Sequence, residues 1–103
     1  MDSAINALLR PKSIAVLGAS ADFQKINGRT LKALLDKGYA GKIYPVNPKY
    51  QAIAGLTCYP DVASMPDAVD LAVVAVPARH VPATLRELGR KKVSAAVVFS
   101  SGF

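Results

Sequence analysis

The chain has 103 residues, a length that fits one domain built around a single hydrophobic core. Hydrophobic residues make up 51% of the sequence and charged residues 19%, which excludes an intrinsically disordered segment. The formal net charge of +6 favours an anionic partner. No run of about eighteen apolar residues occurs and residues 1–10 lack the apolar stretch of a secretory signal, so we expect a cytoplasmic protein without a membrane span.

The first predicted elements are a buried strand and an amphipathic helix. Residues 13–17 form a continuous apolar run that ends at Gly18, which is typical of a central strand in a parallel sheet. Leucines recur at helical spacing within residues 31–35, with charged residues between and beyond them. Gly38 then supplies the C-terminal cap of this predicted helix.

The middle of the chain predicts two more strands with an irregular stretch between them. Residues 42–46 form a short strand in which Pro45 cannot donate to the ladder, so this strand has a free side or ends there. The segment 50–67 is rich in turn residues and predicts only a short strand or helical turn. It contains Cys58, the one cysteine, which we interpret as a buried filler rather than a nucleophile. Residues 70–76 form the next buried strand.

A second helix and a last strand complete the series. Val81, Leu85 and Leu88 recur at helical spacing and predict the apolar stripe of this helix. The cations at residues 90–92 lie at the predicted C-terminal end of this helix, where positive charge interacts favourably with the helix dipole. Residues 94–99 are again apolar and predict one more strand.

The alternation of strands and helices predicts one α/β domain over residues 1–103, with a Rossmann-like parallel sheet in three layers and strand order 3-2-1-4. Ligands of such sheets bind outside the carboxyl ends of the strands, near the point where the strand order reverses. We therefore expect the loops after Leu17, Val46, Val76 and Phe99 to share one rim.

The first of these loops has the composition of a phosphate-binding loop. Gly18, Ala19 and Ser20 follow the buried strand, and Asn27 and Gly28 open the helix, whose N-terminal N–H groups and dipole attract an anion. The two glycines stand too far apart for a G-x-G-x-x-G motif. A purely structural role, in a tight turn and close helix packing, is the alternative.

The second loop reads Val46, Asn47, Pro48 and Lys49. Domains that bind NAD place an acidic residue about twenty residues past the glycines, where it takes the ribose hydroxyls. Here a cation occupies that region, which favours a ribose that carries a phosphate. The 3′-phosphate of coenzyme A (CoA) and the 2′-phosphate of NADP both fit, and a solvated turn lysine is the alternative.

The third loop, with Val76, Pro77 and Ala78, presents small apolar surface that could cover an adenine, or it is simply a strand end made rigid by proline. His80 stands at a helix start without a partner carboxylate, so we interpret it as an exposed capping residue. No catalytic set or metal-ligand spacing can be assembled. Nucleic acid is not expected as a partner, because aromatic residues do not alternate with the basic ones.

The loops together carry a family resemblance, in the segments 11–20, 25–28, 43–49, 75–78 and 100–103. In combination, and over nearly the whole chain from about Leu9, they resemble the CoA-binding domain of the nucleoside-diphosphate-forming acyl-CoA synthetases, which are related to succinyl-CoA synthetase α-subunits. The resemblance implies CoA or acyl-CoA as the ligand and an acid:CoA ligase as the parent enzyme. It also implies that the partners are later domains of that enzyme, which hold the phosphorylated histidine and the nucleotide, so that the chain is a fragment.

The resemblance also implies a role for each loop. Gly18, Ala19, Ser20, Lys25, Asn27 and Gly28 would line the phosphate loop, and Val46, Asn47, Pro48 and Lys49 would hold the adenosine with its 3′-phosphate. Val76, Pro77 and Ala78 would cover the adenine or the upper pantetheine, and Ser100, Ser101 and Gly102 would lie where the thiol arm leaves. Two alternatives stay open, namely an acyl-CoA-sensing domain of a protein acetyltransferase and an NAD(P)-binding domain.

Overall fold

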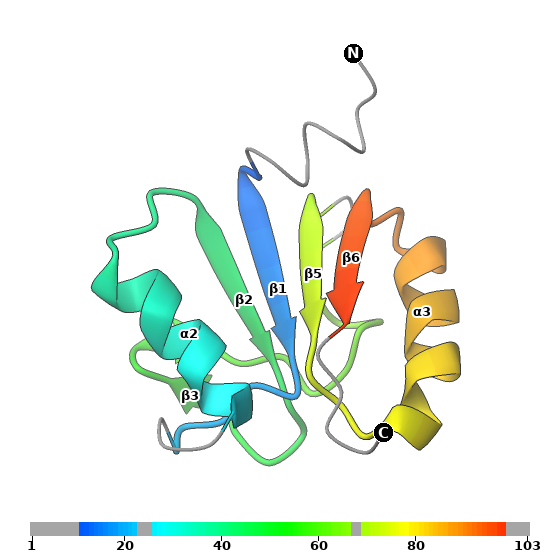
Figure 1. The fold of residues 1–103 in the computed structure, drawn as a ribbon, viewed down its shortest axis with the longest axis horizontal. Helices are drawn as coiled ribbons and strands as arrows, with labels where there is room; N and C mark the ends of the chain where they lie inside the picture. Colours follow the sequence, from blue (N-terminus) through cyan, green and yellow to red (C-terminus); the bar gives the residue numbers. More distant parts are fainter. Residues whose placement is uncertain (1–10, 23–25, 67–68, 99–103) are drawn as a thin grey trace.

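The computed structural model describes residues 11–22, 26–66 and 69–98 of the chain. A parallel sheet forms its centre, and all four strands point their carboxyl ends toward the bottom of Figure 1. The strands are β1 (Ser13–Leu17), β2 (Lys42–Val46), β5 (Leu71–Val74) and β6 (Ala95–Val98). The helices are α2 (Ile26–Asp36), a short 3₁₀ helix (Ala78–His80) and α3 (Val81–Arg90). The predicted α/β class with a Rossmann-like parallel sheet is confirmed.

The strand order differs from the predicted 3-2-1-4 and is corrected to β2-β1-β5-β6. The two most buried strands pair in the middle, so β5 lies directly beside β1, while β2 and β6 form the edges. The chain after β2 adds no full strand, because it folds into a hairpin of two-residue strands, β3 (Ala52–Ile53) and β4 (Leu56–Thr57). Beyond the hairpin, only an isolated parallel bridge joins Val46 to Tyr59.

The backbone nitrogen and carbonyl of Pro45 face the outer side of the edge strand, where no N–H is needed, while its side chain is fully buried. Its carbonyl oxygen faces away from β1 and accepts a hydrogen bond from the N–H of Tyr59 at 2.9 Å. A residue that donated outward from position 45 would have no partner strand there, so proline costs the sheet nothing. β2 is thus an edge strand, as one of the two predicted alternatives requires, but its outer side is paired at the bridge to Tyr59.

Alternate side chains of β1 point to opposite faces of the sheet and produce two separate core clusters. Ile14 and Val16 pack in the cluster that contains Leu31 of α2, whereas Ala15 and Leu17 pack in the cluster that contains Leu88 of α3. The two helices thus cover opposite faces, which confirms the predicted three layers (Figure 1).

Helix α2 ends at Asp36, and the predicted glycine cap follows two residues later. Gly38 has a positive φ of 65°, and the N–H of Tyr39 donates to the carbonyl of Leu34 at 3.1 Å, which closes the last turn. Lys32 and Asp36 form an exposed ion pair one turn apart on the outer face. Within the part of the chain that the structure describes, no helix is long and apolar enough to cross a membrane.

The predicted apolar stripe of α3 is only partly buried. Leu88 is 3% exposed and belongs to the core, but Leu85 is 41% exposed, so its expected burial is wrong. Helix α3 lies at the border of the sheet beside the edge strand β6 (Figure 1), and the sheet ends before it covers the whole stripe.

Candidate functional site

A cavity of about 230 Å³ opens at the carboxyl ends of β1, β2 and β5. The strand order reverses between β1 and β5, because the chain leaves β1 for β2 on one side and returns to β5 on the other. The loops after Leu17, Val46 and Val76 line this cavity together, as predicted. The loop after Phe99 lies outside the described residues. We call this hollow the rim cavity; its wall consists of Leu17, Gly18, Val46, Asn47, Pro48, Asp61, Val62, Val76, Thr84 and Glu87.

At Gly18 the backbone leaves β1 and passes between the ends of the two neighbouring strands, β2 and β5. Its φ is +79°, its N–H donates to the carbonyl of Val46 at 2.8 Å, and an added Cβ would lie 2.4 Å from the carbonyl oxygen of Ala75. Only glycine fits this passage without displacing the end of a strand. The glycine therefore brings backbone, rather than a side chain, to the wall of the cavity.

Asn47 connects the first and second loops. Its Nδ2 donates to the carbonyl of Ala19 at 2.8 Å, and its Oδ1 accepts from the N–H of Lys49 at 2.9 Å. Its own N–H donates to the carbonyl of Tyr59 at 2.9 Å. The side chain thus fixes the distance between the loop after β1 and the turn that carries Lys49.

The small residues of the first loop face inward. Ala19 is fully buried, and Ser20 is 5% exposed with its Oγ accepting from the N–H of Asp22 at 3.0 Å. Gly28 lies buried in the first turn of α2, where the leading N–H groups of a helix have no intrahelical partner. The described part of this loop therefore offers a ligand mainly backbone groups. Lys25 and the side chain of Asn27 lie outside the described residues.

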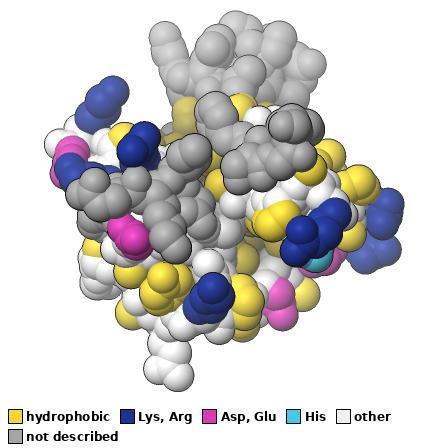
Figure 2. All heavy atoms as spheres, turned by 60° about the horizontal axis from the view of Figure 1, so that its bottom comes forward, with side chains coloured by type: hydrophobic (Ala, Val, Ile, Leu, Met, Phe, Trp, Pro, Cys, Tyr) yellow, Lys and Arg dark blue, Asp and Glu magenta, His cyan; other side chains and the backbone are white. Residues whose placement is uncertain are grey.

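Lys49 is exposed on the turn after β2, and it does not line the rim cavity, although its neighbour Pro48 does. No acidic residue stands between Val46 and Lys49. Figure 2 shows this face of the molecule, with Lys and Arg side chains scattered over it and hydrophobic side chains between them. A ligand in the cavity could therefore contact Lys49 only with a part that extends out of the cavity.

The third loop turns directly into a short helix. Val76 lines the cavity, Pro77 is exposed and caps the 3₁₀ helix, and the half-buried Ala78 begins it. His80 is exposed at the start of α3 as predicted, but its side chain makes no capping hydrogen bond. Ser100, Ser101 and Gly102 lie outside the described residues.

Five residues of the cavity wall were missed by the sequence analysis, and one of them, Leu17, is the last residue of β1. Asp61 and Val62 come from the irregular stretch before β5, and Thr84 and Glu87 come from α3. The spacing of Thr84 and Glu87, one turn apart, indicates a shared face of the helix. Nothing in the sequence indicates that this face turns toward the cavity.

Cys58 is a buried filler, as predicted, with 5% of its surface exposed. Burial raises the pKa of its thiol, against a smaller opposing effect from the hydrogen bond that Sγ donates to the carbonyl of Asn47 at 3.5 Å. The thiol therefore stays protonated and unreactive. Across residues 11–22, 26–66 and 69–98, no group of three or more His, Cys, Asp or Glu could hold a metal ion.

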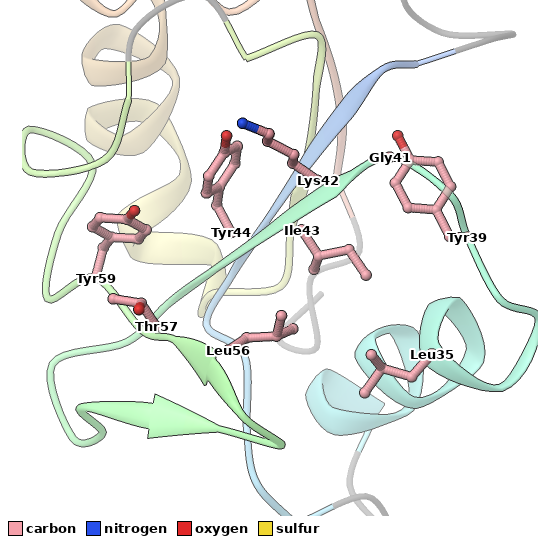
Figure 3. A pocket seen from close by; sticks show the side chains of 9 residues that line it. All are labelled: Leu35, Tyr39, Gly41, Lys42, Ile43, Tyr44, Leu56, Thr57 and Tyr59. Atoms are coloured by element: carbon pink, nitrogen blue, oxygen red, sulfur yellow. The ribbon is translucent and has the colours of Figure 1, made fainter.

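A larger groove of about 410 Å³ runs along the outer edge of β2, away from the rim. Figure 3 shows Tyr44 and Tyr59 on one side of the strand and Ile43 and Leu56 on the other. The two tyrosine rings pack edge to face with centroids 5.9 Å apart. Lys42 is the only charged residue in its wall, and none of the predicted site residues lies there. The rim cavity, although smaller, is therefore the candidate site.

A three-layer parallel domain with a glycine passage and a cavity at its switch point is a Rossmann-like ligand-binding domain. The family described as "CoA binding domain" matches residues 12–103, and the chain belongs to this family. This match favours CoA over the NAD(P) alternative.

Two relatives of the chain are ADP-forming acetate-CoA ligases. It is 47% identical over 96 residues to ADP-forming acetate-CoA ligase I of Archaeoglobus fulgidus, covering 93% of this chain and 14% of the relative. It is 47% identical over 103 residues to the α subunit of ADP-forming acetate-CoA ligase I of Pyrococcus furiosus, covering 96% and 22%.

A solved structure has the same fold. The dinucleotide-forming acetyl-coenzyme A synthetase 1 of Ca. Korarchaeum cryptofilum, in complex with phosphate and ADP, superposes with a TM-score of 0.90 at 44% identity. The match covers 98% of this chain and 22% of that one. The chain therefore spans at most about a fifth of these relatives, and it is homologous to the CoA-binding domain of ADP-forming acyl-CoA ligases.

Proposed function

We propose that residues 1–103 form a CoA-binding module of an ADP-forming acid:CoA ligase that works in the cytoplasm. The observation that carries this proposal is the rim cavity, whose wall combines the glycine passage, the Asn47 turn and Val76 at the switch point of the sheet. The relatives are ligases of this kind, which favours a ligase parent over an acetyltransferase. The partners would be the remaining domains of the same enzyme, with no role for nucleic acid or a membrane.

Each loop is proposed to contact a different part of CoA. The backbone from Gly18 to the start of α2 would receive the pyrophosphate, because helix N-termini favour anions. Lys49 would pair with the 3′-phosphate of the ribose at the mouth of the cavity. The full set is Gly18, Ala19, Ser20, Lys25, Asn27 and Gly28 for the phosphates, Val46, Asn47, Pro48 and Lys49 for the adenosine, Val76, Pro77 and Ala78 for the adenine or upper pantetheine, and Ser100, Ser101 and Gly102 for the thiol arm.

Calorimetric titration of the chain with CoA and with 3′-dephospho-CoA tests this function. We expect CoA to bind about tenfold better, because the 3′-phosphate gains a charge-assisted contact with Lys49. Lys49→Ala should remove most of this preference. Lys42→Ala is the matched control, since Lys42 is exposed at the opposite end of the same strand and should leave the preference unchanged.

Two results would contradict the proposal in different ways. Equal affinity of the unmodified chain for CoA and 3′-dephospho-CoA would remove Lys49 from the site but keep CoA as the ligand. Tight binding of NADPH that CoA cannot displace would replace the coenzyme itself.

A further inference from the structure

The rim cavity is too small for a whole coenzyme and has an uneven wall. Its volume of about 230 Å³ lies below the roughly 300–1,000 Å³ of sites that enclose a drug-sized ligand, so it takes only one part of CoA. Most of the wall is apolar, but α3 and the turn before β5 add Thr84, Glu87 and Asp61. We propose that this cavity receives the adenine base and that Glu87 accepts a hydrogen bond from its exocyclic amino group, a specificity contact that rests on the proposed function.

The charges in the wall decide which part of CoA enters. The side chains of Asp61 and Glu87 are the two carboxyl groups of the wall, and Lys49 lies outside it. Carboxylates repel the phosphates of CoA, whereas a neutral base with an amino group offers them a donor. The base therefore goes into the cavity, and the phosphates stay at the mouth beside the cation and the start of α2.

The carboxylates of Asp61 and Glu87 differ in the hydrogen bonds that they already make. Oδ1 of Asp61 already accepts from the N–H of Ser64 at 2.9 Å, which fixes the turn that it begins. The carboxylate of Glu87 makes no hydrogen bond or ion pair with any residue that the structure describes, and the residue is half-buried. A half-buried acceptor without a partner among the described residues, in a mostly apolar wall, gains most from a donor that a ligand brings.

The rest of the wall suits the faces of a planar ring. Leu17, Val46 and Val62 are buried around the cavity, and Val76 adds apolar surface from the third loop. Thr84 donates its hydroxyl proton to the carbonyl of His80 at 2.8 Å, so it presents no free donor that would compete for the carboxylate one turn later. Helix α3 thus supplies the carboxylate of Glu87 as a strong acceptor in the described part of the wall.

The affinities of CoA and 1,N6-etheno-CoA measure this contact, because the etheno bridge removes both hydrogens of the amino group. We expect the chain to prefer CoA by about tenfold, the size of a charge-assisted hydrogen bond. Glu87→Met, which keeps the length of the side chain without an acceptor, should bring the two affinities to within about threefold. Glu87→Gln keeps a neutral acceptor and should give an intermediate preference.

The control and the contrary outcomes separate this contact from other effects. Asp36→Asn removes the same charge from the outer face of α2 and should keep the preference of the unmodified chain. A preference that persists unchanged in both Glu87 variants would mean that the bulk of the etheno bridge causes it, which would overturn the inference. Equal binding of both coenzymes by the unmodified chain would also overturn it, while the proposed function would stand. Failure to bind CoA at all would instead remove the proposed function.

Discussion

Gly18 is the residue on which the geometry of the rim depends most directly. Gly18→Ala places a Cβ 2.4 Å from the carbonyl oxygen of Ala75 at a φ of +79°. We expect the free energy of unfolding to fall by at least about 2 kcal/mol, because a backbone atom rather than a flexible side chain must move. Urea titration measures this change.

Gly89 provides the matched control for this substitution. An added Cβ there meets nothing within 4 Å, and the residue lies inside α3. Gly89→Ala should therefore stabilise the protein by about 0.5–1 kcal/mol, because alanine has the higher helix propensity. If both substitutions changed stability alike, the close approach at Gly18 would not be the cause.

Individual residues also show how far a sequence predicts a site. The position of Gly18 after a buried strand follows from local pattern alone, and so does the absence of an acid near Lys49. The role of Asn47 does not, because its hydrogen bond to Ala19 spans 28 positions and exists only once β1 and β2 are paired. The sequence does not reveal the position of Glu87 either, because the cavity that it lines forms only when α3 packs on the sheet.

At the scale of elements, Leu85 and Leu88 of α3 share the predicted apolar stripe but differ in burial. Leu88→Ala should lower the free energy of unfolding by about 2–5 kcal/mol, because Leu88 is 3% exposed and leaves a cavity in the core. Leu85→Ala should cost less than about 1 kcal/mol, because Leu85 is 41% exposed. Thermal or urea unfolding of the two variants tests this pair, and equal costs would contradict the edge position of α3.

The strand order shows the same limit of local pattern. Apolar runs predicted the four main strands within a residue or two at each end, because burial on both faces leaves a clear pattern. They did not predict which strands are neighbours, since every central strand reads alike. Two tertiary features make β2 an edge strand. Tyr59 hydrogen-bonds to the outer side of β2 at Pro45, and the hairpin Ala52–Thr57 is too short to extend the sheet.

At the scale of the whole molecule, the buried thiol of Cys58 and the half-buried hydroxyl of Tyr39 couple stability to alkaline pH. Burial raises the pKa of Cys58 above its usual 9.0, and burial together with the charge of Asp70 raises the pKa of Tyr39 above its usual 10.0. Tyr39 also donates its hydroxyl proton to the carbonyl of Pro11 at 2.6 Å, a bond that ionisation would remove. Folding therefore favours the protonated form of both groups.

The native state consequently holds protons that the unfolded chain gives up, so the free energy of unfolding should fall as the pH rises above 9.0. The contribution of each group is complete below its usual pKa and disappears once the pH passes its raised, native value. Urea titrations at pH values below 9.0 and above 10.0 measure this loss, and the double variant Cys58→Ala with Tyr39→Phe should show a shallower decline over the same interval. An equally steep decline in the double variant would mean that Cys58 and Tyr39 have no measurable part in the alkaline effect.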